Sequence, residues 1–175
     1  MATSALPIHD VSVDLACFEV SGQIYGIDVL HIREIVRSQE TTALPSAPEL
    51  IEGVIDLRGA VIPVVDLARA LGSGRAGGDG NARIAIVELD ELVFGLRVDA
   101  AVDVISPAAA SVEEPPALAT HSGYDAVRAV VRRQNEAPVL VLSLEHILES
   151  VYRSAPRRVD GGAPERARTD GGEPR

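Results

Sequence analysis

The chain has 175 residues, a formal net charge of −10 and 46% apolar residues, which is enough for one domain with a sizeable core. A protein that neutralises phosphate groups needs a basic face, so this charge argues against nucleic acid and against an anionic membrane surface as partners. Only 3% of the residues are aromatic and tryptophan is absent, so we expect an aliphatic core.

The basic residues also exclude some chemistry. All 16 of them are arginines, so Schiff-base catalysis and Walker-type phosphate loops, which need lysine, are excluded. The single cysteine, Cys17, lies in the apolar segment LACFEV, where we expect a buried and unreactive thiol. Residues 1–13 lack the features of a signal peptide and no apolar run is long enough to span a bilayer. These features predict a cytoplasmic protein with a flexible N-terminus at residues 1–13.

The first predicted element is a β-hairpin that occurs twice. Residues 19–27 read EVSGQIYGI and residues 88–96 read ELDELVFGL. In each, a strand, a two-residue polar turn and an apolar–aromatic–glycine–apolar strand follow one another. Alternating apolar residues on both sides of such a turn are typical of a hairpin.

A second pattern also occurs twice, in the same order. Residues 60–71 (AVIPVVDLARAL) match residues 137–148 (APVLVLSLEHIL) without a gap. In both, a strand runs into a helix N-cap, Asp66 or Ser143, and then into a short amphipathic helix. Together, the repeats predict a two-lobed, all-β domain over residues 14–150. Its lobes span about residues 16–72 and 83–149, joined by a flexible Gly-rich linker at residues 72–82.

The segments between the repeats complete the prediction. Residues 31–36 (HIREIV) are expected to form a strand with Ile32 and Glu34 on one face. Pro45 and Pro48 indicate a turn before a short helical segment, PELI. Pro63 requires its strand to be an edge or to carry a bulge there. Residues 106–123 are expected to form an ordered, irregular loop, and residues 155–175, rich in Pro, Gly and charge, a disordered tail.

The sequence contains no motif for catalysis, metal binding or a cofactor. The four histidines, which are scattered along the chain, are His9, His31, His121 and His146. The sequence has no zinc-protease motif, no paired cysteines and no calcium loop. We therefore expect no catalytic residue, no metal and no cofactor. A small β protein without such chemistry is typically a binding module, and a small hydrolase or ligand-binding barrel is the weaker alternative.

Two segments resemble the CheW family of bacterial chemotaxis coupling proteins: YGIDVLHIREI, from Tyr25, and ALPSAPELIEGVIDLRGAVIPVVDL, from Ala43. The family pattern begins with Tyr–Gly–Ile–Asp and continues with a strand, which here contains Glu34. Two prolines, here Pro45 and Pro48, follow that strand, and an Asn–Leu–Arg–Gly block comes after them. The resemblance covers about residues 14–150.

The resemblance implies a fold of two small five-stranded β-barrels around a shared aliphatic core. It also implies a non-enzymatic adaptor that is monomeric alone. The adaptor would link the cytoplasmic tip of a methyl-accepting chemoreceptor to the regulatory domain of a CheA-type histidine kinase, recruited to membrane receptor arrays by these partners. The family's contact surfaces correspond here to Ile32, Glu34, Gly53 and Arg58.

The chain departs from the family pattern in two places. Asp56 replaces the asparagine beside Arg58, and the segment AVRAVVRR brings in Arg128, Arg132 and Arg133. The second departure leaves open an adaptor of a gliding or type IV pilus pathway that binds only one partner. For Arg58, two interpretations remain: an ion pair with Asp56 or Glu34 that serves the local scaffold, or a contact presented to a partner.

Overall fold

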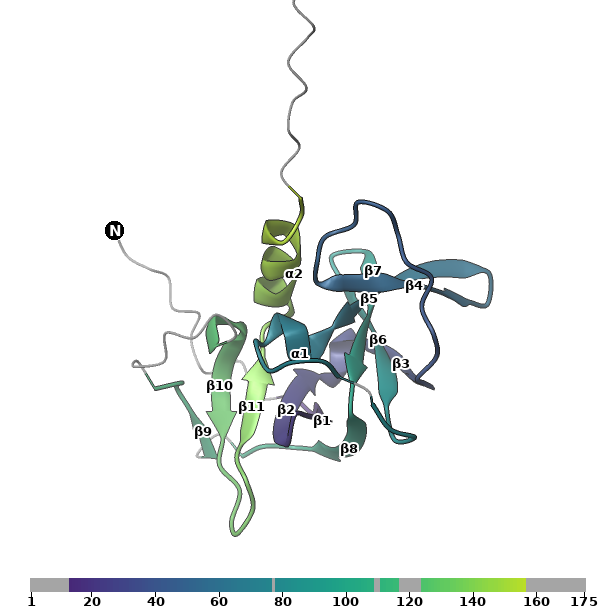
Figure 1. Ribbon diagram of the computed structural model, residues 1–175. Helices are drawn as coiled ribbons and strands as arrows, with labels where there is room; N and C mark the ends of the chain where they lie inside the picture. Colours follow the sequence, from purple (N-terminus) through teal and green to yellow (C-terminus); the bar gives the residue numbers. More distant parts are fainter. Residues whose placement is uncertain (1–12, 77, 109–110, 117–123, 157–175) are drawn as a thin grey trace, which may run out of the picture.

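The computed structural model describes residues 13–76, 78–108, 111–116 and 124–156, and two β-sheets make up most of the regular secondary structure in this part (Figure 1). The predicted flexible N-terminus lies outside the described residues apart from residue 13, and so does the predicted tail apart from residues 155 and 156. Of the loop predicted at residues 106–123, residues 109–110 and 117–123 are also outside. The all-β fold class is confirmed.

The first sheet has six strands in the order β8-β1-β2-β11-β10-β9. Their bounds are β8 Ala100–Ile105, β1 Leu15–Val20, β2 Gln23–Asp28, β11 Val139–Leu142, β10 Val127–Val131 and β9 Val112–Glu113. The second sheet has five strands in the order β3-β6-β7-β5-β4. Their bounds are β3 Ile32–Arg37, β6 Arg83–Leu89, β7 Leu92–Val98, β5 Ala60–Asp66 and β4 Ile51–Leu57. The described backbone pairings run from edge to edge, so neither sheet closes into a hydrogen-bonded ring.

The helices are short. α1 (Leu67–Ala70) follows β5, and α2 (Leu144–Arg153) follows β11; two 3₁₀ turns, η2 (Val29–His31) and η4 (Tyr124–Ala126), precede β3 and β10. The predicted N-caps are confirmed, since Asp66 accepts a hydrogen bond from the Arg69 amide and Ser143 from the His146 amide. Asp66 also accepts from the Ala76 amide at 3.0 Å, which ties the linker to the start of α1.

The hairpin turns predicted from the repeat are present. Ser21 and Gly22 connect β1 to β2 with φ angles of +51° and +77°, and Asp90 and Glu91 connect β6 to β7 with +47° and +66°. Positive φ at both central residues is the geometry that matches the twist of paired strands.

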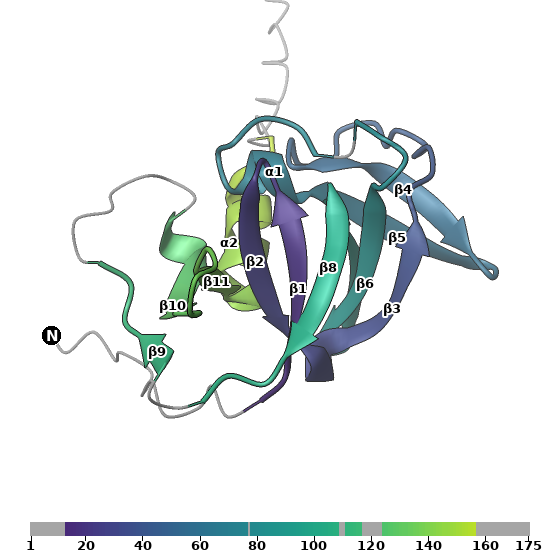
Figure 2. The ribbon, with the colours of Figure 1, turned by 90° about the horizontal axis from the view of Figure 1, so that it is seen from below.

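Each sheet takes strands from both halves of the chain. The hairpin β1–β2 pairs in parallel with β11 from the second half, and β7 pairs in parallel with β5 from the first half. The two registers correspond, because Gly26 faces Val141 just as Gly95 faces Val64. The repeats in the sequence are therefore interleaved in space, and Figure 2 shows the hairpin β1–β2 beside β8.

The core is aliphatic and is shared by the two sheets. The largest cluster includes Phe18 and Ile27 from the six-stranded sheet, Val87 and Leu96 from the five-stranded sheet, and Ile147 from α2. Smaller clusters line the inside of each sheet. Burial of these side chains is the main stabilising contribution to the fold.

The segment PELI is not a helix, and that prediction was wrong. The Ile51 amide donates to the Pro48 carbonyl at 3.0 Å, which makes a single turn. Leu50 then packs against the core and Ile51 begins β4. Only Glu49 and Leu50 lie between Pro48 and the start of β4, which is too few residues for a stable helix.

The expectation for Pro63 holds only locally, because β5 lies between β7 and β4 in the sheet and the register shift is on β4, between Ile51 and Gly53. Pro63 faces Val54 of β4, and the pairing of β5 with β7 begins only at Val64. At Pro63 the strand therefore has a neighbour on one side only. The amide and carbonyl of Val54 point away from Pro63 and bond to Thr42 instead, so the missing N–H of proline leaves no partner unsatisfied.

Candidate functional site

The four predicted contact residues lie on the two edge strands of the five-stranded sheet. Ile32 and Glu34 are on β3, Gly53 is on β4, and Arg58 is in the turn between β4 and β5. β3 and β4 stand at opposite ends of the strand order, yet Arg58 after β4 pairs with Glu34 of β3, and Thr42, beyond the end of β3, forms a backbone bridge with Val54 of β4. The sheet is therefore strongly curved, and we call these four residues the β3–β4 surface.

Arg58 and Glu34 form a two-pronged ion pair across this gap. The Nη1 and Nη2 atoms of Arg58 lie 2.8 Å and 2.9 Å from the two carboxylate oxygens of Glu34. The Arg58 side chain is 76% exposed and that of Glu34 is 29% exposed. An exposed pair of this kind contributes at most about 1 kcal/mol to stability.

Arg58 is displayed by a two-residue hairpin turn. Arg58 and Gly59 have φ angles of +53° and +84°, and Asp56 accepts a hydrogen bond from the Gly59 amide at 2.8 Å. Asp56 thus closes the turn, while Arg58 pairs with Glu34. Of the two interpretations from the sequence, the ion pair with Glu34 is present, and its exposure leaves the guanidinium open to a partner as well.

Ile32 and Gly53 are less accessible. Ile32 is partly buried against the core. Gly53 is buried because the chain after β3 crosses directly over it: a Cβ there would lie 2.6 Å from the Thr42 carbonyl oxygen and 2.8 Å from Thr41 Cβ. Gly53 therefore permits a close approach, which is a different contribution from that of an exposed contact.

A buried ion pair lies beside this crossing and was not anticipated from the sequence. Arg97 of β7 pairs with Glu52 of β4, donates to the Ser38 hydroxyl, and donates to the Gln39 carbonyl oxygen at 2.9 Å. The Arg97 and Glu52 side chains are 10% and 11% exposed. Arg97 is the only charged residue in the run VFGLRV, and that interruption was the available signal.

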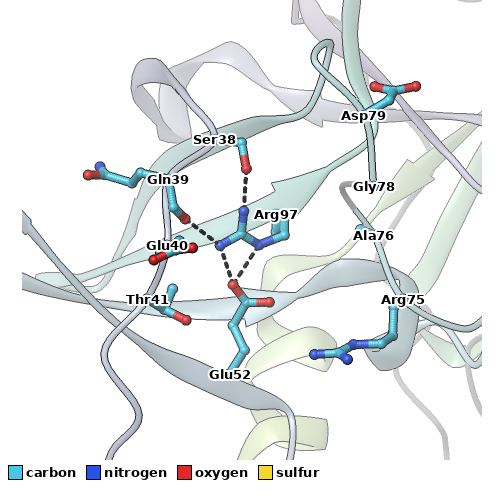
Figure 3. A pocket seen from close by; sticks show the side chains of 10 residues that line it. All are labelled: Ser38, Gln39, Glu40, Thr41, Glu52, Arg75, Ala76, Gly78, Asp79 and Arg97. Atoms are coloured by element: carbon cyan, nitrogen blue, oxygen red, sulfur yellow. Dashed lines mark hydrogen bonds and ion pairs between the residues drawn. The ribbon is translucent and has the colours of Figure 1, made fainter.

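The pair borders an open hollow of about 780 Å³ (Figure 3). Its lining is largely polar and comprises Ser38, Gln39, Glu40, Thr41, Glu52, Arg75, Ala76, Gly78, Asp79 and Arg97. Arg97 already donates to Glu52, Ser38 and Gln39, so its guanidinium is not a free donor for an anion in the hollow. Within the described ranges, no group of three or more His, Cys, Asp or Glu side chains is placed to hold a metal ion.

The second-lobe arginines are mostly paired with nearby acids. Arg132 lies 2.7 Å from Glu113, and Arg133 lies 2.5 Å from Glu136. Arg128 is exposed on β10. The positive charge noted in the sequence is thus largely neutralised within this lobe.

The remaining reactive side chains serve the scaffold. The Nδ1 atom of His31 lies 3.1 Å from the Glu88 carbonyl oxygen, and that of His146 lies 2.9 Å from the Ser143 hydroxyl. Cys17 is buried, and burial raises the pKa of its thiol, so the thiol stays protonated at neutral pH. His9 and His121 lie outside the described residues. In the described part of the chain, no helix is long and apolar enough to cross a membrane.

Comparisons with known proteins agree with the resemblance in the sequence. A family model described as the CheW-like domain matches residues 14–152. The chain is 27% identical to the chemotaxis protein CheW of Treponema pallidum, over 83% of this chain and 87% of the relative. It is 29% identical to CheW of Rhizobium meliloti, over 89% of this chain and 99% of the relative.

A solved structure is also similar. The scaffolding protein TtCheW from Thermoanaerobacter tengcongensis superimposes with a TM-score of 0.70 and 32% sequence identity, covering 78% of this chain and 87% of that chain.

Proposed function

The chain belongs to the CheW family, and from this premise we propose that it is a non-catalytic adaptor that couples chemoreceptors to a CheA-type histidine kinase. The regulatory domain of the kinase and the cytoplasmic tip of the receptor would be its two partners. It would act in the cytoplasm, recruited to membrane receptor arrays by these contacts.

The observation that carries this proposal is the exposed Arg58–Glu34 pair. It lies on two edge strands and presents a fixed, planar guanidinium beside a carboxylate. Arginine is enriched at binding hot spots because its planar group makes directional bonds. The side chains of Leu30, Ile35 and Val61 are also exposed, and Ile35 follows Glu34 directly in β3.

The proposal is tested by reconstituting the three components. Kinase autophosphorylation is measured with a receptor cytoplasmic fragment, the histidine kinase encoded nearest to this protein, and the protein itself. We expect stimulation only when all three are present, because an adaptor acts by stoichiometric binding. Arg58→Ala should reduce the stimulation, whereas Arg153→Ala, which removes another exposed arginine on α2, should not.

Two results would contradict the proposal. Stimulation that does not require the receptor would remove the coupling role. Binding of only one partner would instead favour the adaptor of a gliding or pilus pathway. The local pairing of Arg132 and Arg133 weakens the sequence argument for that alternative, since little uncompensated charge remains in the second lobe.

A further inference from the structure

We propose that Arg97 and Glu52 are positioning residues, whose buried ion pair holds residues 38–42 against β4 and thereby fixes the geometry of the β3–β4 surface. The link to partner binding rests on the proposed function, whereas the link to local geometry does not. Neither residue contacts the exposed part of that surface, so both would act through the chain between β3 and β4.

Arg97 connects three parts of the five-stranded sheet. From β7 it reaches Glu52 near the start of β4, and it reaches the Ser38 hydroxyl and the Gln39 carbonyl oxygen just after the end of β3. Figure 3 shows the guanidinium between Glu52 and residues 38–39. One side chain thus joins the two edges of the sheet through a strand that lies between them.

The chain continues from this contact into the crossing over β4. Thr42 and Val54 exchange two backbone hydrogen bonds, at 2.8 Å and 2.9 Å, and Gly53 leaves the space that the crossing needs. Residues 38–42 are therefore held at one end by Arg97 and at the other by Val54. This segment follows β3 directly, so it links the end of β3 to β4 in addition to the ladder that holds β3 on β6.

The charges of Arg97 and Glu52 are not needed for stability alone. Burying two charges removes their hydration, and a well-packed apolar pair is often as stable. An apolar side chain at position 97, however, would make no bond to the Ser38 hydroxyl or the Gln39 carbonyl oxygen. Arginine has five donors in a rigid planar arrangement, so it can bind a carboxylate and two further acceptors in one fixed geometry.

The test compares two double variants of the full-length protein by amide hydrogen exchange. Arg97→Met with Glu52→Met removes the buried pair without leaving one charge unpaired. Arg69→Met with Glu49→Met makes the same chemical change at a pair that is more exposed and joins α1 to the segment before β4. Exchange is followed at the amides of Thr42 and Val54, with amides in the β6–β7 ladder as an internal reference for global stability.

In the first variant we expect exchange at Thr42 and Val54 to become at least tenfold faster, while the β6–β7 amides are unchanged. Its affinity for the kinase regulatory domain should fall about tenfold. The control variant should show neither change. Unchanged exchange at Thr42 would overturn the proposal, and so would faster exchange with full affinity. If the wild-type protein does not bind the kinase domain, the proposed function fails, and the exchange at Thr42 still decides the local geometry.

Discussion

Five strands of the six-stranded sheet, β8-β1-β2-β11-β10, follow the same order as the five-stranded sheet, β3-β6-β7-β5-β4, but the two sheets differ in the charged residues at one equivalent place. By the sequence repeat and the strand registers, Arg97 and Glu52 of the five-stranded sheet correspond to Asp28 and Arg128 of the six-stranded sheet. In the first case the charges meet and are buried. In the second, Asp28 accepts a hydrogen bond from the Leu30 amide and Arg128 is exposed.

This difference shows that the fold itself does not require a buried ion pair. Both sheets carry a register shift at the corresponding position, next to Glu52 in β4 and next to Arg128 in β10. Of the two sheets, only the five-stranded one has a buried carboxylate, that of Glu52, at this register shift. The same sheet carries the second ion pair, Arg58–Glu34, and the crossing of residues 41–42 over Gly53. Its edges are therefore held together by side chains, and these edges carry the proposed contact surface.

The largest loss of stability is expected when one member of the buried Arg97–Glu52 pair is removed. Arg97→Met leaves the Glu52 carboxylate buried without its cation, and we expect a loss of about 3–5 kcal/mol in the free energy of unfolding. Urea denaturation measures it. Arg69→Met, which leaves the exposed Glu49, should lose less than about 1 kcal/mol. Equal losses in the two variants would mean that Glu52 is as well hydrated as Glu49.

The crossing over Gly53 provides the next comparison. Its counterpart in the six-stranded sheet is Ala129, which is buried although β9 pairs with the next residue of β10, Val130. We expect Gly53→Ala to lose about 1–3 kcal/mol of unfolding free energy, since the new methyl group would meet the Thr42 carbonyl. Ala129→Gly should lose roughly 1 kcal/mol or less. A Gly53→Ala protein of wild-type stability would show that the crossing can move away from β4 at little cost.

The salt concentration should affect the two ion pairs, Arg58–Glu34 and Arg97–Glu52, to different extents. In double-mutant cycles, we expect a coupling energy of about 0.2–1 kcal/mol between Arg58 and Glu34, because the pair is exposed. At 1 M salt, where the Debye length is about 3 Å, this coupling should largely disappear. The coupling between Arg97 and Glu52 should change little, since buried pairs are screened much less. Equal salt dependence would contradict the difference in burial.

The change in protein stability at alkaline pH should depend on two buried groups of the core, Cys17 and Tyr25, and not on the two ion pairs. Burial raises the pKa of Cys17 above its ordinary 9.0 and that of Tyr25 above its ordinary 10.0. The unfolded chain therefore loses these protons first as pH rises, so stability is full below about pH 9 and falls above it. Cys17→Ala should reduce this fall, as measured by urea denaturation between pH 8 and 10.5. An unchanged fall would exclude the thiol as a cause.

Local features of the fold were predictable from the sequence. The turns at Ser21–Gly22 and Asp90–Glu91, the caps Asp66 and Ser143, and the restriction at Pro63 all follow from a few neighbouring residues. The repeat also indicated two related halves. It could not show that the halves are interleaved, because the parallel pairing of β2 with β11 joins residues more than a hundred positions apart, such as Tyr25 and Leu140.

The site was predictable only in part, for the same reason. The family resemblance led to Glu34 and Arg58, and the structure pairs them. It also led to Gly53, whose close approach to Thr41 and Thr42 depends on where the chain crosses β4. Arg97 and Glu52 are 45 positions apart in the chain, and no pattern in either segment indicates that the two residues meet. Whether Ile32, Glu34, Gly53 and Arg58 contact a partner stays a prediction.

If the exposed Arg58–Glu34 pair serves binding and the buried Arg97–Glu52 pair serves geometry, a change at Arg58 should weaken binding without loss of stability. The most direct measurement is calorimetric titration of the wild-type protein and of Arg58→Ala against the regulatory domain of the histidine kinase encoded nearest to it. We predict a 1:1 complex with a dissociation constant of roughly 1 μM, about −8 kcal/mol. Arg58→Ala should bind at least tenfold more weakly while its unfolding free energy stays within about 1 kcal/mol of the wild type. Equal affinity in a fully folded variant would contradict the claim.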